Sequence, residues 1–404
     1  MKKTLKFAIM AVAALAAVAC NGSSDSDELS SQEEALKAAV TEYVPNVIYE
    51  IYGNLADNTA ALYESLAYLK EKGVNSLTQT DIDKVCTKFL NARTWWEQSE
   101  AFLFGAATAY GIDPHIDSWP LDKDKLAKEL SNATVIADLE AEGAGAVDEV
   151  GVANLGFHGI EFILFRDGAN RTVSALKGNE TDEAFASYSV SGADELIFAT
   201  AVAEDLRNYC WELQCAWDPN APSDRVEYVE DELELNTTLD SGLTYGENLL
   251  ASGTAGSTFS SWQRAVSTIL VGGCSNICSE VANSKIASAY TGDDTDYIES
   301  PYSKKSYEDF ANNIRSIVFS LYGSEGASEP SSKCIYSVLK KYNYSGLSDL
   351  QSSLDAALNS LIKCITSGVA FVDDPDAACA GAAIDAINAL DDELNKAADF
   401  VETL

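Results

Sequence analysis

The sequence predicts an all-α protein in which two helical-bundle domains pack with a cleft between them. Apolar residues recur at intervals of three and four along most of the chain, as they do on one face of a helix. Alternating patterns of β-branched residues, which are typical of strands, are essentially missing. With 404 residues, 47% of them hydrophobic, the chain is long enough for two domains.

The first bundle is expected over residues 33–220. Pro45 should kink or split its opening helix, because proline lacks the amide hydrogen that an α-helix interior requires. Asp218 and Pro219 close its last helix. The helices that follow the opening one are expected at 60–69, 80–110, 123–139, 156–165 and 184–217.

The second bundle is expected over residues 221–404. An acidic, loop-like stretch with Pro222, residues 220–239, marks the boundary between the two bundles. Helices are then expected at 246–252, 258–290, 307–322, 333–342, 347–367 and 377–404.

Residues 1–19 are typical of a signal peptide, because lysines precede an apolar run too short to span a bilayer. The run ends in Ala17-Val18-Ala19-Cys20, which resembles a bacterial lipoprotein box. Cys20 is therefore expected to be lipidated, and an ordinary secretory signal with a stray cysteine is the alternative. Residues 20–32 are polar and acidic, as in a flexible tether. We expect an exported protein, anchored by lipid at the outer membrane on its periplasmic or cell-surface face.

The net charge of −36 restricts the partners of the chain. A field of this sign repels phosphate backbones, and no basic, aromatic-rich patch interrupts it, which excludes nucleic-acid binding. The same field raises the local concentration of cations. A metal ion or a small ligand is the expected partner.

Eight cysteines remain beside Cys20, an even number for which disulfides are plausible in an oxidising compartment. Cys334 begins one expected helix and Cys364 ends the next. An antiparallel pair of helices would bring the two together, so a bridge between them is expected.

His158 is one of only two histidines in the chain, and it belongs to the sequence Gly156-Phe157-His158-Gly159-Ile160-Glu161. On a helix His158 and Glu161 project from one face, where an imidazole beside a carboxylate suits a metal or acid–base site. Gly156 and Gly159 leave this region free of bulk, so another element or a ligand could approach closely. A chain so poor in histidine must rely on oxygen ligands.

Known zinc-peptidase motifs do not fit this histidine. No H-E-x-x-H is present, Phe162 stands where the inverted motif needs a histidine, and no histidine follows His158. His115, the other histidine, is expected in an exposed loop. A metal-dependent peptidase with Glu161 as general base is kept as an alternative function.

A second candidate cluster lies on the helix expected at 80–110. Arg93, Glu97 and Glu100 follow one another at i, i+4 and i+7, and Trp96 indicates that this helix is largely buried. Since burying an arginine with two carboxylates is unfavourable unless the groups pair or serve a site, two interpretations stay open: a structural ion network or a ligand site.

In this order and spacing, three motifs resemble the imelysin family: Trp96-x-x-x-Glu100-Ala-Phe-Leu-Phe-Gly105, then Ile116-Asp117-Ser118-Trp119-Pro120, then G-x-H-x-x-E at 156–161. The segments 245–250 and 302–315 are similar to the family's second half. The resemblance implies an all-helical, two-bundle protein that takes part in bacterial iron uptake, with iron-transport components as partners.

The resemblance also implies a metallopeptidase activity. The zinc ligands that known zinc peptidases need are missing here, so the sequence does not support this activity. The resemblance implies iron as the bound metal, with other divalent cations as alternatives, and Trp119-Pro120 as a turn that supports the cleft. The metal ligands it implies are His158, Glu161, Glu100 and Glu97. The ligand-binding residues it implies are Arg93, Trp96, Gly156, Ser303, Ser306 and Asn313. A structural surface protein without a metal site is the remaining alternative.

Overall fold

The computed structural model describes residues 29–404. The expected signal peptide, Cys20 and most of the expected tether lie outside these residues. Within them the helices are joined by turns and loops, and the strands are the two-residue β1 (Phe165–Arg166) and β2 (Ala169–Asn170), which pair antiparallel. The all-α fold predicted from the periodicity is confirmed.

A long helical rod opens the fold. It consists of α1 (Ser31–Tyr43), the π-helical segment η1 (Val44–Tyr49) and α2 (Glu50–Lys72). Pro45 lies in the first turn of η1, so the proline interrupts the α-helix as expected without ending the rod.

The rod begins slightly earlier than the expected end of the tether at residue 32. Ser30 caps the helix and exchanges side-chain hydrogen bonds with Glu33 in a capping box. Residues 30–32, which were expected to belong to the tether, therefore form the cap and the first residues of α1.

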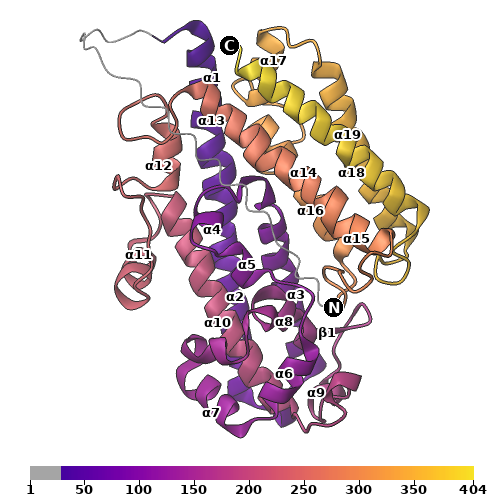
Figure 1. Ribbon diagram of the computed structural model, residues 1–404. Helices are drawn as coiled ribbons and strands as arrows, with labels where there is room; N and C mark the ends of the chain where they lie inside the picture. The colour runs from indigo at the N-terminus through magenta and orange to yellow at the C-terminus, as the bar shows by residue number, and fades with distance from the viewer. Residues whose placement is uncertain (1–28) are drawn as a thin grey trace, which may run out of the picture.

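The other long helices of the first half pack along α2 (Figure 1). These are α3 (Gln79–Glu97) and α10 (Gly192–Trp217), and α8 (Gly156–Leu164) lies against both of them. The shorter helices are α4 (Ala106–Ala109), α5 (Asp113–Ile116), α6 (Lys123–Leu130), α7 (Ala133–Glu142), α9 (Val173–Leu176) and α11 (Ser223–Glu227).

The second half of the chain, meaning the residues after α11, begins with α12 (Tyr245–Leu250). One continuous helix, Trp262–Tyr290, combines α13, α14 and α15 with the π-helical segments η8 (Ile269–Ser275) and η9 (Val281–Ile286). The remaining helices are α16 (Ser306–Tyr322), α17 (Ile335–Lys341), α18 (Leu347–Ser367) and α19 (Ala378–Val401).

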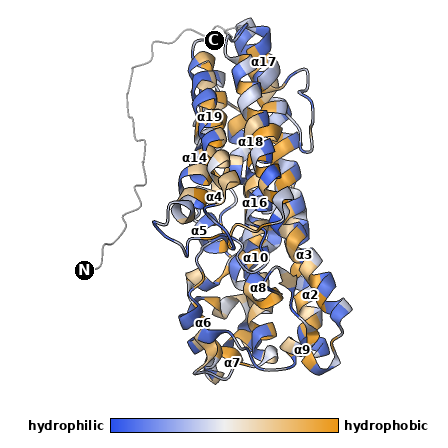
Figure 2. Ribbon diagram, turned by 90° about the vertical axis from the view of Figure 1, so that its right-hand side faces the viewer, coloured by the Kyte–Doolittle hydropathy of each residue, from blue (hydrophilic) through white to orange (hydrophobic). Residues whose placement is uncertain are grey.

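In residues 29–404, Trp262–Tyr290 is the one helix that by length and composition could cross a membrane, but 67% of its most apolar window is buried within the molecule. It is a core helix of the second half. Figure 2 shows hydrophobic and hydrophilic residues mixed along the helices in view, as expected of amphipathic helices that pack side by side.

The two halves meet along several elements. Helix α1 packs against α13 and α17, although it precedes the first-half helices in the chain, and α16 packs against α3. The division into domains at residue 220 stays a prediction. The contact of α16 with α3 is the one that positions the site described below.

Several of the expected helices have different ends. The helix expected at 60–69 is part of the longer α2. The helix expected at 80–110 ends at Glu97 and is followed by a 3₁₀ turn at Glu100–Phe102. Gly105, further along, adopts φ +113, which an α-helix cannot include, and a Cβ atom there would lie 2.8 Å from the indole ring of Trp217. The helix expected at 123–139 is divided into α6 and α7, and Asn132 caps the second. The helix expected from residue 184 begins at Gly192, after the capping box of Ser191.

The disulfide expected between Cys334 and Cys364 is wrong. All eight cysteines of the described residues are free. Helix α18 packs mainly along α19 and only slightly against α17, so the two thiols are not brought together. The Cys334 thiol instead donates to the carbonyl of Ser331, at 3.1 Å.

Candidate metal centre

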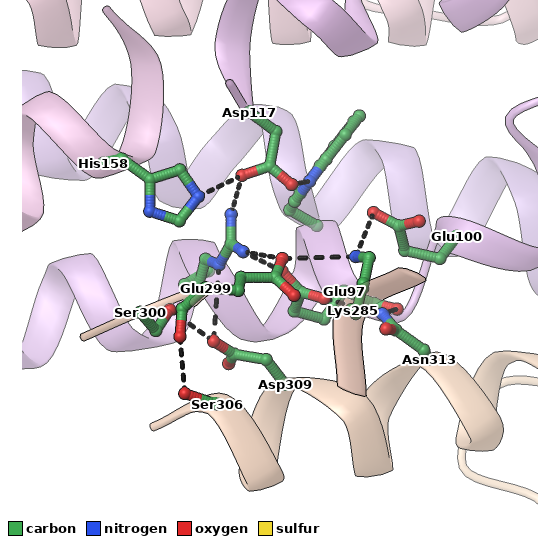
Figure 3. Close-up of polar contacts among 12 residues, drawn as sticks. Glu97, Glu100, Asp117, His158, Lys285, Glu299, Ser300, Ser306, Asp309 and Asn313 are labelled. Carbon is green, nitrogen blue, oxygen red and sulfur yellow. Dashed lines mark hydrogen bonds and ion pairs between the residues drawn. The ribbon is translucent and has the colours of Figure 1, made fainter. Parts of the chain in front are cut away.

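Arg93 belongs to a buried cluster of charged side chains where the two halves meet, and four carboxyl groups contact it. Figure 3 shows this cluster with those four residues, Glu97, Asp117, Glu299 and Asp309, labelled. The guanidinium of Arg93 donates through Nη1 to Asp117 and through Nη2 to Glu299, at 2.5 Å from Oε1. Nη2 is also 2.6 Å from Oε1 of Glu97, one turn further along α3. Arg93 is only 2% exposed, so these carboxylates and not water compensate its charge.

Asp117 connects this arginine to the histidine. It follows α5, and its Oδ2 accepts a hydrogen bond from Nε1 of Trp96 at 2.8 Å. Its Oδ1 lies 3.1 Å from Nε2 of His158. Gly156 makes this approach feasible, because it adopts φ +61 and a Cβ atom there would lie 1.8 Å from the carbonyl oxygen of Ile116.

His158 and Glu161 project from one face of α8, as their spacing predicts. Nδ1 of His158 is 3.5 Å from Oε2 of Glu161. The other carboxylate oxygen of Glu161 accepts the backbone N–H of Ser303 at 2.7 Å, which ties α8 to the second half.

The second half contributes a matching set of polar groups. Nδ2 of Asn313, on α16, donates to Oε2 of Glu97 at 2.6 Å. Oγ of Ser306 donates to the backbone carbonyl of Glu299, and Oγ of Ser300 donates to Asp309 at 2.5 Å. Asp309 lies 3.7 Å from Nε of Arg93.

Lys285 is the second buried cation of the cluster. Its Nζ lies 3.2 Å from Oε1 of Glu299 and 3.9 Å from Oε1 of Glu100. Glu100 lies beyond the end of α3 in a 3₁₀ turn, so it faces Lys285 and does not continue the stripe of Arg93 and Glu97. The expected i, i+4, i+7 stripe is therefore wrong at its third position, although Glu100 belongs to the cluster.

All of the sequence-predicted site residues are found in or beside this cluster. Glu97, Glu100, His158 and Glu161 supply carboxylate or imidazole groups, while Trp96, Ser303, Ser306 and Asn313 donate hydrogen bonds to members of the cluster or their backbone. Gly156 contributes no polar side chain; because it lacks a Cβ atom, the backbone of Ile116 can pack directly against it. Whether any of them contacts a ligand stays a prediction.

Sequence reasoning missed Asp117, Lys285, Glu299 and Asp309. Asp117 and Asp309 lie inside segments that resemble the family, so the signal was present but only their neighbours were assigned. The one sequence signal for Lys285 is that it is a basic residue within a largely apolar helix. Glu299 has no local signal, because its partners are far away in the sequence.

The His115 side chain is separate from the cluster. Its Nε2 lies 2.8 Å from Oδ2 of Asp205, and its ring packs against Tyr209 with 4.2 Å between ring centroids. It is partly buried and not the exposed loop residue that the sequence suggested.

Burial and the neighbouring charges shift the pKa values in opposite directions. Burial raises the pKa values of Glu97 and Glu100 well above the usual range, more than Arg93 and Lys285 respectively lower them. Burial also acts to raise the pKa of Asp117, but the charges of Arg93 and His158 outweigh it and hold that pKa well below its usual range. Burial acts to lower the pKa of His158, but the hydrogen bonds to Asp117 and Glu161 outweigh it and raise that pKa to about 9.

The cluster contains more acidic than basic groups, and each member is at most 4% exposed. Six carboxyl groups face three cationic groups: Glu97, Glu100, Asp117, Glu161, Glu299 and Asp309 against Arg93, His158 and Lys285. Within the described residues, Oε2 of Glu100 and Oε2 of Glu299 are buried without a hydrogen-bond partner. Buried carboxylate oxygens without partners are unfavourable, and a bound cation would satisfy them.

Two groups of side chains present ligand atoms close enough to hold one ion. The first is Asp117, His158 and Glu299, and the second is Glu97, Glu100 and Asp117; in each, the ligand atoms lie within 4.8 Å of one another. Carboxylate oxygens with one imidazole nitrogen suit iron, manganese and zinc, and the all-oxygen group also suits calcium. The donor set therefore fits the metals that the sequence implied.

A cavity of about 510 Å³ reaches the cluster from the surface. His158 is the cluster member that lines it. Both halves of the chain contribute the other walls, among them Trp119, Lys123, Thr295, Ile298, Pro301 and Tyr302. Trp119 and Pro120, which were expected to support a cleft, also line this cavity, and whether it separates two bundles stays a prediction.

The fold and the site define an all-helical protein with a buried, acidic, histidine-containing centre at the junction of its two halves. Residues 48–397 match the family model described as Imelysin, so the chain belongs to the imelysin family.

Relatives with similar sequence or structure agree with this assignment. The chain is 25% identical over 273 residues to iron-regulated protein A of Synechococcus elongatus, a match that covers 67% of this chain and 60% of that protein. The matched region is thus less than two thirds of that relative's length.

Two crystal structures have similar folds. A protein described as an iron-regulated protein A precursor from Parabacteroides distasonis superposes with a TM-score of 0.73 at 25% identity, covering 91% of this chain and 95% of that one. An imelysin-like protein from Psychrobacter arcticum has a TM-score of 0.57 at 14% identity, covering 91% and 94%, which shows the fold alone.

Proposed function

We propose that this imelysin-family chain captures one iron ion at the buried centre and takes part in iron uptake. The observation that carries the proposal is the group Asp117, His158 and Glu299, whose ligand atoms lie within 4.8 Å of one another in a cluster with an excess of carboxyl groups. The names of the relatives, iron-regulated protein A, support an iron-related role.

The ligands come from both halves of the molecule. Asp117 and His158 belong to the first half and Glu299 to the second, so a bound ion would hold the halves together. Metal binding would also release a proton, because the pKa of His158 is raised to about 9 and an imidazole must be neutral to bind a metal ion. The acidic surface of the protein favours the approach of cations.

Export and lipid attachment through Cys20 are part of the proposal. They rest on the lipoprotein-like sequence before Cys20, which would place the binding domain at the outer membrane with iron-transport components as partners. Labelling with a palmitate analogue, with and without Cys20→Ser, tests this part separately. Unlabelled wild type would contradict it.

Calorimetry with Fe²⁺ under anaerobic conditions tests the metal site directly. The wild type should bind one ion, and His158→Ala should weaken binding at least tenfold. His115→Ala is the matched control, because it removes the only other histidine and lies outside the cluster. If the wild type gives no heat and no rise in melting temperature with Fe²⁺, Mn²⁺ or Zn²⁺, the proposal fails and a structural role for the cluster remains.

A further inference from the structure

Lys285 is an unusual residue to find in the core of a helical bundle. Its side chain is 1% exposed and lies in η9, a π-helical segment of the apolar core helix. An ammonium group removed from water is strongly unfavourable unless anions surround it. The burial of Lys285 therefore indicates a role that depends on its positive charge.

Carboxylates surround the ammonium group on three sides. Nζ lies 3.2 Å from Glu299, 3.9 Å from Glu100 and 3.9 Å from Glu280, whose side chain is 36% exposed at the edge of the cluster. The indole ring of Trp119 covers it, with 5.1 Å from Nζ to the ring centroid. Only the Glu299 oxygen is within ordinary hydrogen-bond distance, so Lys285 acts mainly as a shared positive charge.

The two groups of candidate metal ligands meet at this lysine. They share Asp117, and Lys285 faces one carboxylate from each: Glu299 of the first group and Glu100 of the second. Two ligand groups with a common carboxylate are the arrangement found in sites that hold two ions a few ångströms apart. Here the protein already supplies two positive charges among these carboxylates: Arg93, which pairs with Asp117, Glu97 and Glu299, and Lys285, which lies between Glu299 and Glu100.

We propose that Lys285 determines the metal stoichiometry of the centre: its ammonium group occupies a second cation position, bounded by Glu100, Glu280 and Glu299, and restricts the protein to one ion. This inference rests on the proposed metal-binding function. It assigns Lys285 a specificity-determining role, since a lysine in place of a second ion turns a two-ion arrangement into a one-ion arrangement.

Replacing the lysine should open the second position. Lys285→Ala removes the ammonium and leaves a space of about the size of a propylammonium ion, while Glu100, Glu280 and Glu299 keep their carboxylates. A divalent cation would then neutralise these groups in place of the lysine, since carboxylates are the ligands that manganese prefers.

Mn²⁺ is the probe, because equilibrium dialysis counts the bound ions and electron paramagnetic resonance distinguishes a single ion from a coupled pair. Wild type should bind one Mn²⁺ with the spectrum of an isolated ion. Lys285→Ala should bind two with a coupled spectrum, and propylammonium chloride should return the count to one. Lys305→Ala, which removes an exposed lysine paired with Glu308, is the control and should bind one.

Lys285→Gln serves as a second variant if Lys285→Ala does not fold, because its amide keeps a hydrogen-bond donor without the charge. It should also bind two ions. One bound ion in a folded Lys285 variant would overturn the stoichiometry proposal while leaving the iron-capture proposal intact. No bound ion in the wild type would instead overturn both.

Discussion

Nδ2 of Asn313 lies 2.6 Å from Oε2 of Glu97 and joins residues 216 positions apart in the chain. This hydrogen bond crosses the junction of the halves, from α16 to the end of α3, and the same amide also donates to the backbone carbonyl of Glu97 at 3.2 Å. A residue of the second half, Asn313, therefore fixes the side chain of Glu97, a candidate metal ligand of the first half.

Asn313→Ala is therefore expected to destabilise the protein. Loss of the amide leaves buried oxygen atoms of Glu97 unpaired, which costs about 1–3 kcal/mol of unfolding free energy. Urea denaturation monitored by circular dichroism measures this change. Asn283→Ala is the control, because Asn283 is exposed and donates to another asparagine; an equal loss in both variants would contradict the importance of the junction.

Gly156→Ala should disturb the centre without changing any charged group. A Cβ atom at residue 156 would lie 1.8 Å from the carbonyl oxygen of Ile116, so the segment that carries Asp117 must move. Gly111→Ala is matched, since Gly111 has a similar φ of +67 but no atom near its Cβ position. The control should lose about 1–2 kcal/mol for the left-handed backbone alone.

The Gly156 variant should lose at least twice as much in urea denaturation, and its Mn²⁺ affinity should fall while that of the control does not. Equal stability of the two variants would mean that the backbone of Ile116 can move away at little cost.

Asp117→Ala should be among the most damaging single substitutions in the cluster. Asp117 interacts with Arg93, Trp96 and His158, and it belongs to both candidate ligand groups. Removing one partner of a buried ion pair leaves an uncompensated charge and costs about 3–5 kcal/mol. Asp57→Ala removes the partner of a far more exposed ion pair, with Arg225, and should cost about 1 kcal/mol or less in the same denaturation measurement.

Glu212→Gln should stabilise the protein in a pH-dependent manner. Burial raises the pKa of Glu212 to about 7 from an ordinary 4.5. The folded state thus binds this proton more tightly than the unfolded state, so the wild type loses stability as the pH rises from about 4.5 and the loss is complete above about 7.

Glutamine mimics the protonated acid and removes this loss. The variant should melt several degrees above the wild type at pH 8 and at nearly the same temperature at pH 4.5. Glu140→Gln, at an exposed position, should show no difference at either pH. A stabilisation of Glu212→Gln that is equal at both pH values would rule out ionisation as its cause.

The helical content could be predicted from periodicity because most helices are amphipathic. The helix at 347–367 was predicted with both ends where α18 has them, at Leu347 and Ser367. The helix expected to reach residue 110 was too long because apolar residues continue past Glu97 into turns that are equally buried. The close packing of Gly105 against Trp217, 112 positions away, is a tertiary contact that the local sequence does not indicate.

The site could be predicted where its residues share a segment and not where they meet across the fold. His158 and Glu161 lie on one helix turn, and their spacing alone places them together. Glu299 joins Arg93 over 206 positions and Lys285 over 14, and no local pattern indicates either contact. The family resemblance supplied Ser303, Ser306 and Asn313, which the chemistry of single residues would not have selected.

Glu299 and Asp117 meet Arg93 from opposite sides of the junction, and neither is reachable from solvent while the helices stay packed. Any movement that separates the two halves would therefore break the buried ion pair between Glu299 and Arg93, which is strongly unfavourable, whereas Asp117 lies in the same half as Arg93.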